Sequence, residues 1–255
     1  ANGEMLVFGG FAAFWMYTAA QVSPLLTVFL VAPAAFAMNW VIYSVMLRPL
    51  VRRARSRGQL EVDAILATFG LSFVSVGIML ALFGGDYFNY SYLARPITLA
   101  GDTYALNRAT AFVAAVLICA AVYLWLNLSR PGLSIRAIAV APDSARLVGI
   151  DVPRLAALAF ALGGAITATG GALLSMFFTL DASTGVIFTL KALVIVIMGG
   201  VGDVRGTIVA ALALGILETF VAAVIDPGLT LAAAYLLFIV ILLFRPQGLF
   251  GRRGA

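Results

Sequence analysis

Long apolar stretches alternate with short polar ones along the whole chain. Eight apolar stretches are evident, and most approach or exceed the roughly 20 residues that a membrane-spanning helix needs. They run over 5–20, 22–47, 64–83, 109–128, 155–178, 186–198, 207–225 and 229–244. Lipid offers the backbone no hydrogen bonds, and the stretches are too long and continuously apolar for barrel strands. The pattern predicts an all-α polytopic integral membrane protein with about eight segments, in one transmembrane domain over 1–255.

Arginines gather in the polar stretches that follow the second, fourth, sixth and eighth apolar segments. They are Arg48, Arg52, Arg53, Arg55 and Arg57; Arg130, Arg136, Arg146 and Arg154; Arg205; and Arg245, Arg252 and Arg253. If every segment spans, all four regions lie on one side, which the positive-inside rule assigns to the cytoplasm. The sixth segment is short, and a re-entrant half-helix there would reverse everything after it.

Composition supports the same class of protein. The chain is 63% hydrophobic and 11% charged, whereas a soluble domain is about half apolar and a quarter charged. Its net charge of +5 comes from arginines between apolar segments, which argues against nucleic-acid binding. With one cysteine, Cys119, and no histidine, the sequence predicts no internal disulfide, metal site, cofactor or catalytic residue. A transport protein is expected rather than an enzyme.

The polar stretch over 129–154 is too long for a simple turn and too polar to enter the membrane. Pro142 suits the first position of a helix, and Asp143 would follow in its first turn. Arg146 suits the last turn, and Gly149 can stop the helix in a left-handed conformation. The sequence therefore predicts a short helix that begins at Pro142 and ends before Gly149. Spacing alone leaves open whether it contacts a soluble partner or is only a structured loop.

Lys191 and Glu218 are ionisable residues inside apolar segments. Such groups are costly in lipid, which makes them candidates for function. Both lie at comparable depth when counted from the turn between their segments, so they can form an ion pair. Two alternatives stay open: either side chain lines a translocation path for a zwitterionic solute, or Lys191 snorkels to the outer interface.

Asn2 and Glu4 open the first apolar segment. One interpretation is a helix N-cap with an acid in the first turn. The other is a broken membrane helix whose free N–H groups meet a substrate carboxylate.

Four stretches carry a resemblance to a known family. They are RAIAVAPDSARLVGIDVPRL over 136–155, IMGGVGDVRGTIVAALALGILE over 197–218, LLFRPQGLFGRR over 242–253 and ANGEMLVFGGFAAF over 1–14. In this order they resemble the permeases of the branched-chain amino acid family of ABC transporters, and specifically the first of its two permease types. The family usually has a histidine where Asn2 stands and one more helix before this point, so we expect the chain to be an N-terminally truncated fragment.

The resemblance implies a division of labour. Two permease subunits, identical or different, would form the path, two cytoplasmic ATP-binding subunits would dock on coupling helices, and an extracytoplasmic binding protein would deliver the solute. Arg136, Pro142, Asp143, Arg146 and Gly149 are then the expected ATPase-coupling residues within 129–154. The absence of a phosphate-binding G-x-x-x-x-G-K-[ST] motif agrees with ATP hydrolysis in separate subunits. Amino acids, amides and urea all fit as substrates.

A bacterial or archaeal inner membrane is the expected location, with membrane lipid as the surrounding partner. A secondary transporter or channel for small solutes is the alternative function. Such proteins usually carry several acids or histidines within their spans for ion coupling, and here only Glu218 is convincingly inside.

Overall fold

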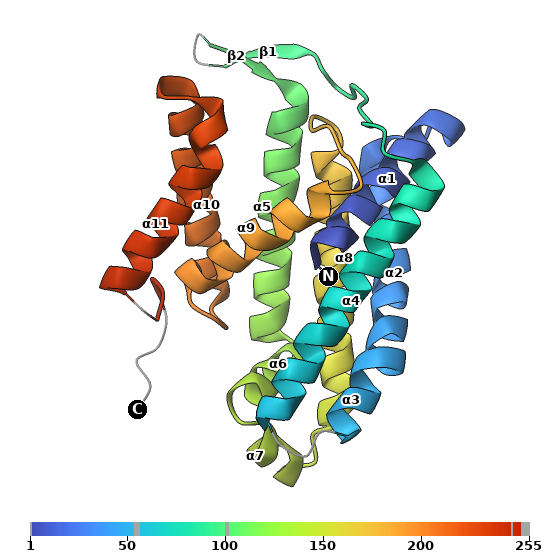
Figure 1. Cartoon of the computed structure of the whole chain (residues 1–255), viewed down its shortest axis with the longest axis vertical. Coiled ribbons are helices and arrows are strands. Elements are labelled where there is room, and N and C mark those ends of the chain that lie inside the picture. Colours follow the sequence, from blue (N-terminus) through green and yellow to red (C-terminus); the bar gives the residue numbers. More distant parts are fainter. Residues whose placement is uncertain (1, 54–56, 100–101, 246, 251–255) are drawn as a thin grey trace. The chain divides into compact units, whose positions relative to one another are not determined.

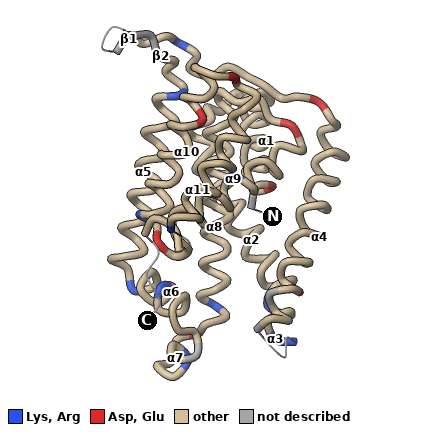
Figure 2. Tube along the Cα trace, turned by 60° about the vertical axis from the view of Figure 1, so that its left-hand side comes forward, with Lys and Arg blue, Asp and Glu red and all other residues tan. Residues whose placement is uncertain are grey.

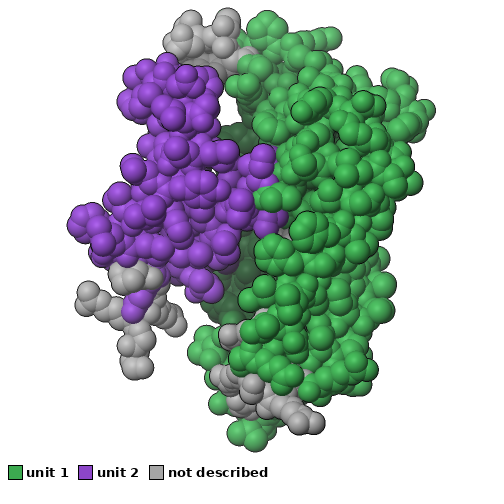
Figure 3. Space-filling view, in the orientation of Figure 1, with its two compact units in different colours: residues 1–186 green, residues 187–255 purple. Residues whose placement is uncertain are grey.

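The computed structural model describes residues 2–53, 57–99, 102–245 and 247–250. The chain separates into two compact units, Ala1–Val186 and Ile187–Ala255, which Figure 3 shows in different colours. Each unit is considered by itself below.

Helices make up most of the first unit (Figure 1). In chain order its elements are α1 Asn2–Ala20, α2 Pro24–Ile42, the π-helical turn η1 Tyr43–Leu47, α3 Arg48–Arg53, α4 Arg57–Phe83, β1 Pro96–Leu99, β2 Asp102–Ala105, α5 Leu106–Leu128, α6 Arg130–Val140, α7 Pro142–Leu147 and α8 Val152–Leu174. The helix α9, Thr184–Gly199, begins in this unit and continues into the second. The second unit adds α10 Val204–Val224, the 3-10 turn η2 Pro227–Leu229 and α11 Thr230–Phe244.

The predicted all-α polytopic class is confirmed, and each of the eight apolar segments coincides with a helix. Within the described residues, six helices are long and apolar enough to cross a membrane, and the continuous run Pro24–Arg53 counts as one of them. The helix α9 is shorter, with 16 residues. The strands β1 and β2 form a small antiparallel hairpin in which Pro96 pairs with Ala105.

The first unit is organised around α1, α2 and α8, whose backbones approach closely. A Cβ atom added at Gly171 of α8 would lie 1.8 Å from the carbonyl oxygen of Leu6, and one at Gly9 would lie 1.9 Å from that of Ala168. Only glycine permits these crossings, because any larger side chain would overlap backbone. Small residues commonly allow membrane helices to pack this way.

An amide side chain fills the crossing between α2 and α8. Asn39 is 2% exposed and donates from Nδ2 to the carbonyl oxygen of Ala35 at 2.8 Å. A Cβ at Gly164 would lie 2.1 Å from the Asn39 amide, so this glycine makes room for it. A buried polar group thereby has a partner, as a site without water requires.

Two loops of the first unit meet at one end of its helices. Phe88 and Leu180 form an isolated antiparallel bridge, with N–H···O distances of 2.9 and 3.0 Å. One loop follows α4 and the other follows α8, and the alternation of spans predicts both on the extracytoplasmic side. Figure 2 shows the basic residues of α3, α6 and α7 at the other end of this unit, as the positive-inside rule expects.

The tyrosines of the loop after α4 fold back onto α1. Tyr90 stacks on Tyr17 with ring centroids 5.0 Å apart, and its hydroxyl lies 2.9 Å from that of Ser175. Tyr92 meets Tyr17 edge to face. Tyr87, in contrast, is 78% exposed. Tyr90 and Tyr92 therefore hold this loop on the helices rather than pointing to solvent.

The turn between α9 and α10 is tight and carries two left-handed glycines, Gly200 (φ 101°) and Gly202 (φ 89°). The chain after α11 returns to this turn. The N–H groups of Leu249 and Phe250 donate to the carbonyl oxygens of Met198 and Gly199 at 2.7 and 3.2 Å. The returning segment thus satisfies carbonyl groups that the end of a helix leaves free.

Candidate functional site

The predicted short helix at Pro142 is present as α7, Pro142–Leu147. Gly149 follows it with φ 81°, the left-handed conformation expected of a helix stop. Asp151 then caps α8 by accepting from the N–H of Arg154 at 3.1 Å. The prolines, the glycine and the aspartate therefore set the boundaries of these elements as their chemistry predicts.

A second helix, α6, precedes α7 and was not anticipated from the sequence. Ser129 begins it by accepting at Oγ from the N–H of Gly132 at 3.1 Å. A Cβ at Gly132 would lie 2.6 Å from the backbone of Leu126, so α6 folds directly against the end of α5. The apolar residues Ile135, Ile138 and Ala139, at the i, i+3, i+4 spacing of one helix face, were the available signal for a helix.

The five expected coupling residues fall in different settings. Arg136 donates from Nη1 to Oδ1 of Asn127 at 2.7 Å, which ties α6 to α5. Pro142 and Gly149 bound α7, and Arg146 is exposed on its last turn. The side chain of Asp143 lies outside the described residues. Beside Arg146, Leu147 and Val148 are 88% and 74% exposed, so α7 ends in an uncovered apolar tip.

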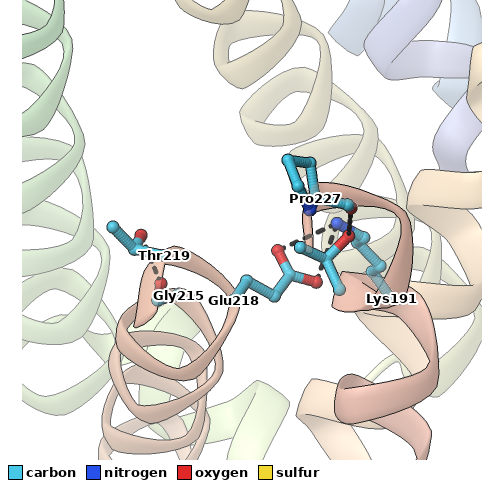
Figure 4. Close-up of polar contacts among 6 residues, drawn as sticks. Lys191, Gly215, Glu218, Thr219 and Pro227 are labelled. Carbon is cyan, nitrogen blue, oxygen red and sulfur yellow. Dashed lines mark hydrogen bonds and ion pairs between the residues drawn. The ribbon is translucent and has the colours of Figure 1, made fainter. Parts of the chain in front are cut away.

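Lys191 of α9 and Glu218 of α10 form an ion pair in the second unit (Figure 4). The Lys191 ammonium Nζ lies 2.8 Å from Oε1 and 2.9 Å from Oε2 of Glu218, so both carboxylate oxygens face one cation. The side chains are 24% and 22% exposed. Oε1 has no further hydrogen-bond donor among the described residues. The two opposite charges therefore compensate each other in direct contact.

Glu4 is 3% exposed, and it lies against the first turn of α9 within the first unit. A Cβ at Gly185 would lie 2.3 Å from Oε2 of Glu4, so the absence of a side chain there admits the carboxylate. The N-terminal turn of a helix favours a negative charge. Gly185 is a feature that the sequence analysis missed. Asn2 begins α1, but its side chain lies outside the described residues.

Metal binding has no visible support in the part of the chain that is described. No three Asp, Glu, Cys or His side chains gather there as a metal site requires.

Comparison with known proteins gives a consistent result. A family model described as "Branched-chain amino acid transport system / permease component" matches residues 1–244. The chain is 26% identical to the high-affinity branched-chain amino acid transport system permease protein LivH of Salmonella typhimurium, and 28% identical to the corresponding protein BraD of Pseudomonas aeruginosa. Each alignment covers 99% of this chain and 85% of the relative.

A probable branched-chain amino acid transport permease protein LivH of Methanocaldococcus jannaschii is 23% identical over 98% of the chain and 82% of its own length. No solved structure gives a significant match. The apolar helices and these relatives identify a multi-pass protein of the inner membrane. Because the family model covers almost the whole chain, the protein belongs to the permease components of branched-chain amino acid transport systems.

Proposed function

We propose that this chain is the membrane-spanning permease subunit of an ATP-driven ABC importer. It moves branched-chain amino acids, or related small polar solutes, by alternating access. A second permease subunit completes the path, two ATP-binding subunits dock from the cytoplasm, and an extracytoplasmic binding protein supplies the solute. The relatives' names support the substrate class, since they are described as branched-chain amino acid permeases.

The observation that carries the proposal is the projecting helix α7. It connects α6 to α8 at the arginine-rich end of the first unit, and Leu147 and Val148 at its tip are exposed. A short helix with an uncovered apolar tip and a terminal cation, Arg146, suits a groove on a soluble partner. Movement of that partner would act directly on α5 and α8, because α6 is bonded to α5 and Asp151 caps α8.

Lys191 and Glu218 hold α9 and α10 in the arrangement that the transport cycle needs, and we assign them this supporting role within the membrane. Glu4 has the corresponding role between α1 and α9, where its carboxylate lies against Gly185. This chain itself carries out no covalent chemistry, and ATP is hydrolysed in the partner subunits.

The test is affinity purification of the full-length native protein from mild detergent, with co-purifying proteins identified by mass. We expect a second permease and ATP-binding subunits, together with uptake of labelled leucine in proteoliposomes that requires ATP. Leu147→Asp should release the ATP-binding subunits. Tyr87→Asp should retain them, because Tyr87 is also largely exposed but lies at the other end of the first unit. Purification of the protein alone, with leucine uptake driven by an ion gradient, would overturn the proposal in favour of a secondary transporter.

A further inference from the structure

Two hollows open beside the π-helical turn η1 in the first unit. The basic hollow has a volume of about 410 Å³ and is lined by Ser44, Arg48, Pro49, Arg52 and Arg53. The apolar groove has a volume of about 350 Å³ and is lined by Tyr43, Ile135, Ile138, Ala139, Leu155, Ala156, Ala159 and Phe160. Tyr43 lines the apolar groove, and the next residue, Ser44, lines the basic hollow. The turn η1 therefore separates a cationic site from an apolar one.

The turn η1 produces this division. In a π-helix the backbone N–H donates to the carbonyl group five residues earlier, and the N–H of Arg48 accordingly donates to the carbonyl oxygen of Tyr43. Arg48 therefore follows Tyr43 by one turn of backbone, and Tyr43 lines the apolar groove whereas Arg48 lines the basic hollow. Such turns are frequently found at functional sites.

The three arginines of the basic hollow have no counter-charge in the described structure. Arg48, Arg52 and Arg53 are exposed, and the ion pair resolved among described side chains is the one between Lys191 and Glu218. Three guanidinium groups and the Ser44 hydroxyl together provide a dense set of hydrogen-bond donors in this hollow. Guanidinium groups bind phosphate oxygens through two parallel hydrogen bonds.

The position along the helix indicates where the phosphate comes from. The hollow lies at the end of the membrane-length run Pro24–Arg53, on the side that the basic residues assign to the cytoplasm. Val41 and Val45, about two turns and one turn before Pro49, are 57% and 72% exposed, as a lipid-facing surface requires. A group that reaches the arginines along this surface needs an anionic head and an apolar chain.

We propose that the basic hollow and the apolar groove together bind one anionic phospholipid of the cytoplasmic leaflet. Its phosphate contacts Arg48, Arg52 and Arg53, and one acyl chain lies in the groove between α6 and α8. The lipid thereby connects the end of α2 to α6, the helix that precedes α7. Clusters of arginine at the cytoplasmic end of a membrane-spanning helix attract anionic phospholipid head groups.

The test uses the full-length complex in nanodiscs of phosphatidylglycerol and phosphatidylcholine, with retained lipid counted by native mass spectrometry. We expect selective retention of phosphatidylglycerol. Arg48→Gln with Arg52→Gln should weaken retention about 25-fold, at about fivefold for each arginine. The matched control is Arg130→Gln with Arg154→Gln, which removes the same charge from exposed positions outside both hollows and should change retention little.

A second pair of measurements separates the lipid from other anions. Ala159→Phe fills the groove and should remove the contribution of the acyl chain. Retention of long-chain dioleoyl phosphatidylglycerol should then fall to the level of the short-chain dihexanoyl lipid. If inorganic phosphate displaces the long-chain lipid at equal phosphate concentration, the acyl chain does not contribute and the proposal fails. It also fails if both double variants lose lipid equally, or if the Arg48 and Arg52 variant releases only the ATP-binding subunits.

Discussion

Helices α1 and α8 of the first unit meet backbone to backbone, whereas α9 and α10 of the second unit are joined by a charged pair. At the first contact, Gly171 and Gly9 leave no room for even one added carbon. At the second, the long side chains of Lys191 and Glu218 bridge the helices through charges 2.8 Å apart. The first contact involves no charged group but tolerates no added volume. The second depends on both charged partners.

The largest effect is expected where the backbones cross. Gly171→Leu would force the side chain into the carbonyl group of Leu6, which cannot move without displacing α1. We expect a loss of about 3 kcal/mol or more in stability, because overpacking against backbone cannot be relieved by rotamer changes. This loss of stability is measured by thermal unfolding in detergent, in which the readout is the fraction of protein that stays monodisperse.

The same helix offers a matched control for that variant. Gly170 lies next to Gly171, yet a Cβ there would meet nothing within 4 Å. Gly170→Ala should leave the melting temperature unchanged or slightly higher, since alanine favours the helix. Equal loss in both variants would show that glycine acts through helix flexibility rather than close approach.

A double-mutant cycle examines the charged contact. Lys191→Met leaves the Glu218 carboxylate without its cation in an apolar segment, and we expect about 2 kcal/mol of destabilisation. The pair is about a quarter exposed, so this is less than the loss for a fully buried pair. Lys191→Met with Glu218→Leu should recover most of the stability, because neither charge remains. If the double variant is as unstable as the sum of the two single ones, the residues act independently.

A smaller effect is expected where the extracytoplasmic loop is held on α1. Tyr90→Phe removes the hydroxyl that lies 2.9 Å from that of Ser175 but keeps the ring stacked on Tyr17. We expect a loss of about 1 kcal/mol, typical of one hydrogen bond. Tyr87→Phe, at an exposed ring, should have no effect on the same unfolding measurement.

The smallest effect concerns the loop before α9. Burial raises the pKa of Asp181, but hydrogen bonds from the hydroxyl and N–H groups of Ser183 and Thr184 outweigh it and lower the pKa below 3.8. A lowered pKa contributes stability that is present above the unfolded value and is lost as pH falls through the folded one. Asp181→Asn should therefore cost less than about 1 kcal/mol at pH 7. The difference from wild type should disappear in unfolding measurements below the lowered pKa. A cost that persists at low pH would mean that the carboxylate charge is not involved.

The helices themselves could be predicted from the sequence because apolar length alone specifies a span. Their contacts could be predicted only in part. The small-residue face of α8 is evident, but Gly164 and Gly171 contact other helices while Gly163 and Gly170 meet nothing within 4 Å. The spacing from Gly164 to Gly171 is two helical turns, which identifies the contacting face once a partner is known. Sequence alone does not give the partner.

The candidate site shows the same limit. Pro142 and Gly149 fixed the ends of α7 because each has a specific backbone preference. The π-helical turn at Tyr43–Leu47 has no comparable residue signature. The role of Gly185, which makes room for the Glu4 carboxylate, depends on a contact between residues far apart in the chain. Contacts between residues far apart in the chain depend on tertiary packing, which no local pattern contains.

The return of Leu249 and Phe250 to the end of α9 has a consequence for synthesis of the protein on the ribosome. The donors to the carbonyl groups of Met198 and Gly199 are translated about 50 residues after these groups. At the usual rate of synthesis this is a delay of roughly 3–10 s. During that interval these two carbonyl groups lack the donors that they have in the folded chain. The turn after α9 can therefore reach its final hydrogen bonding only after Leu249 and Phe250 have been translated.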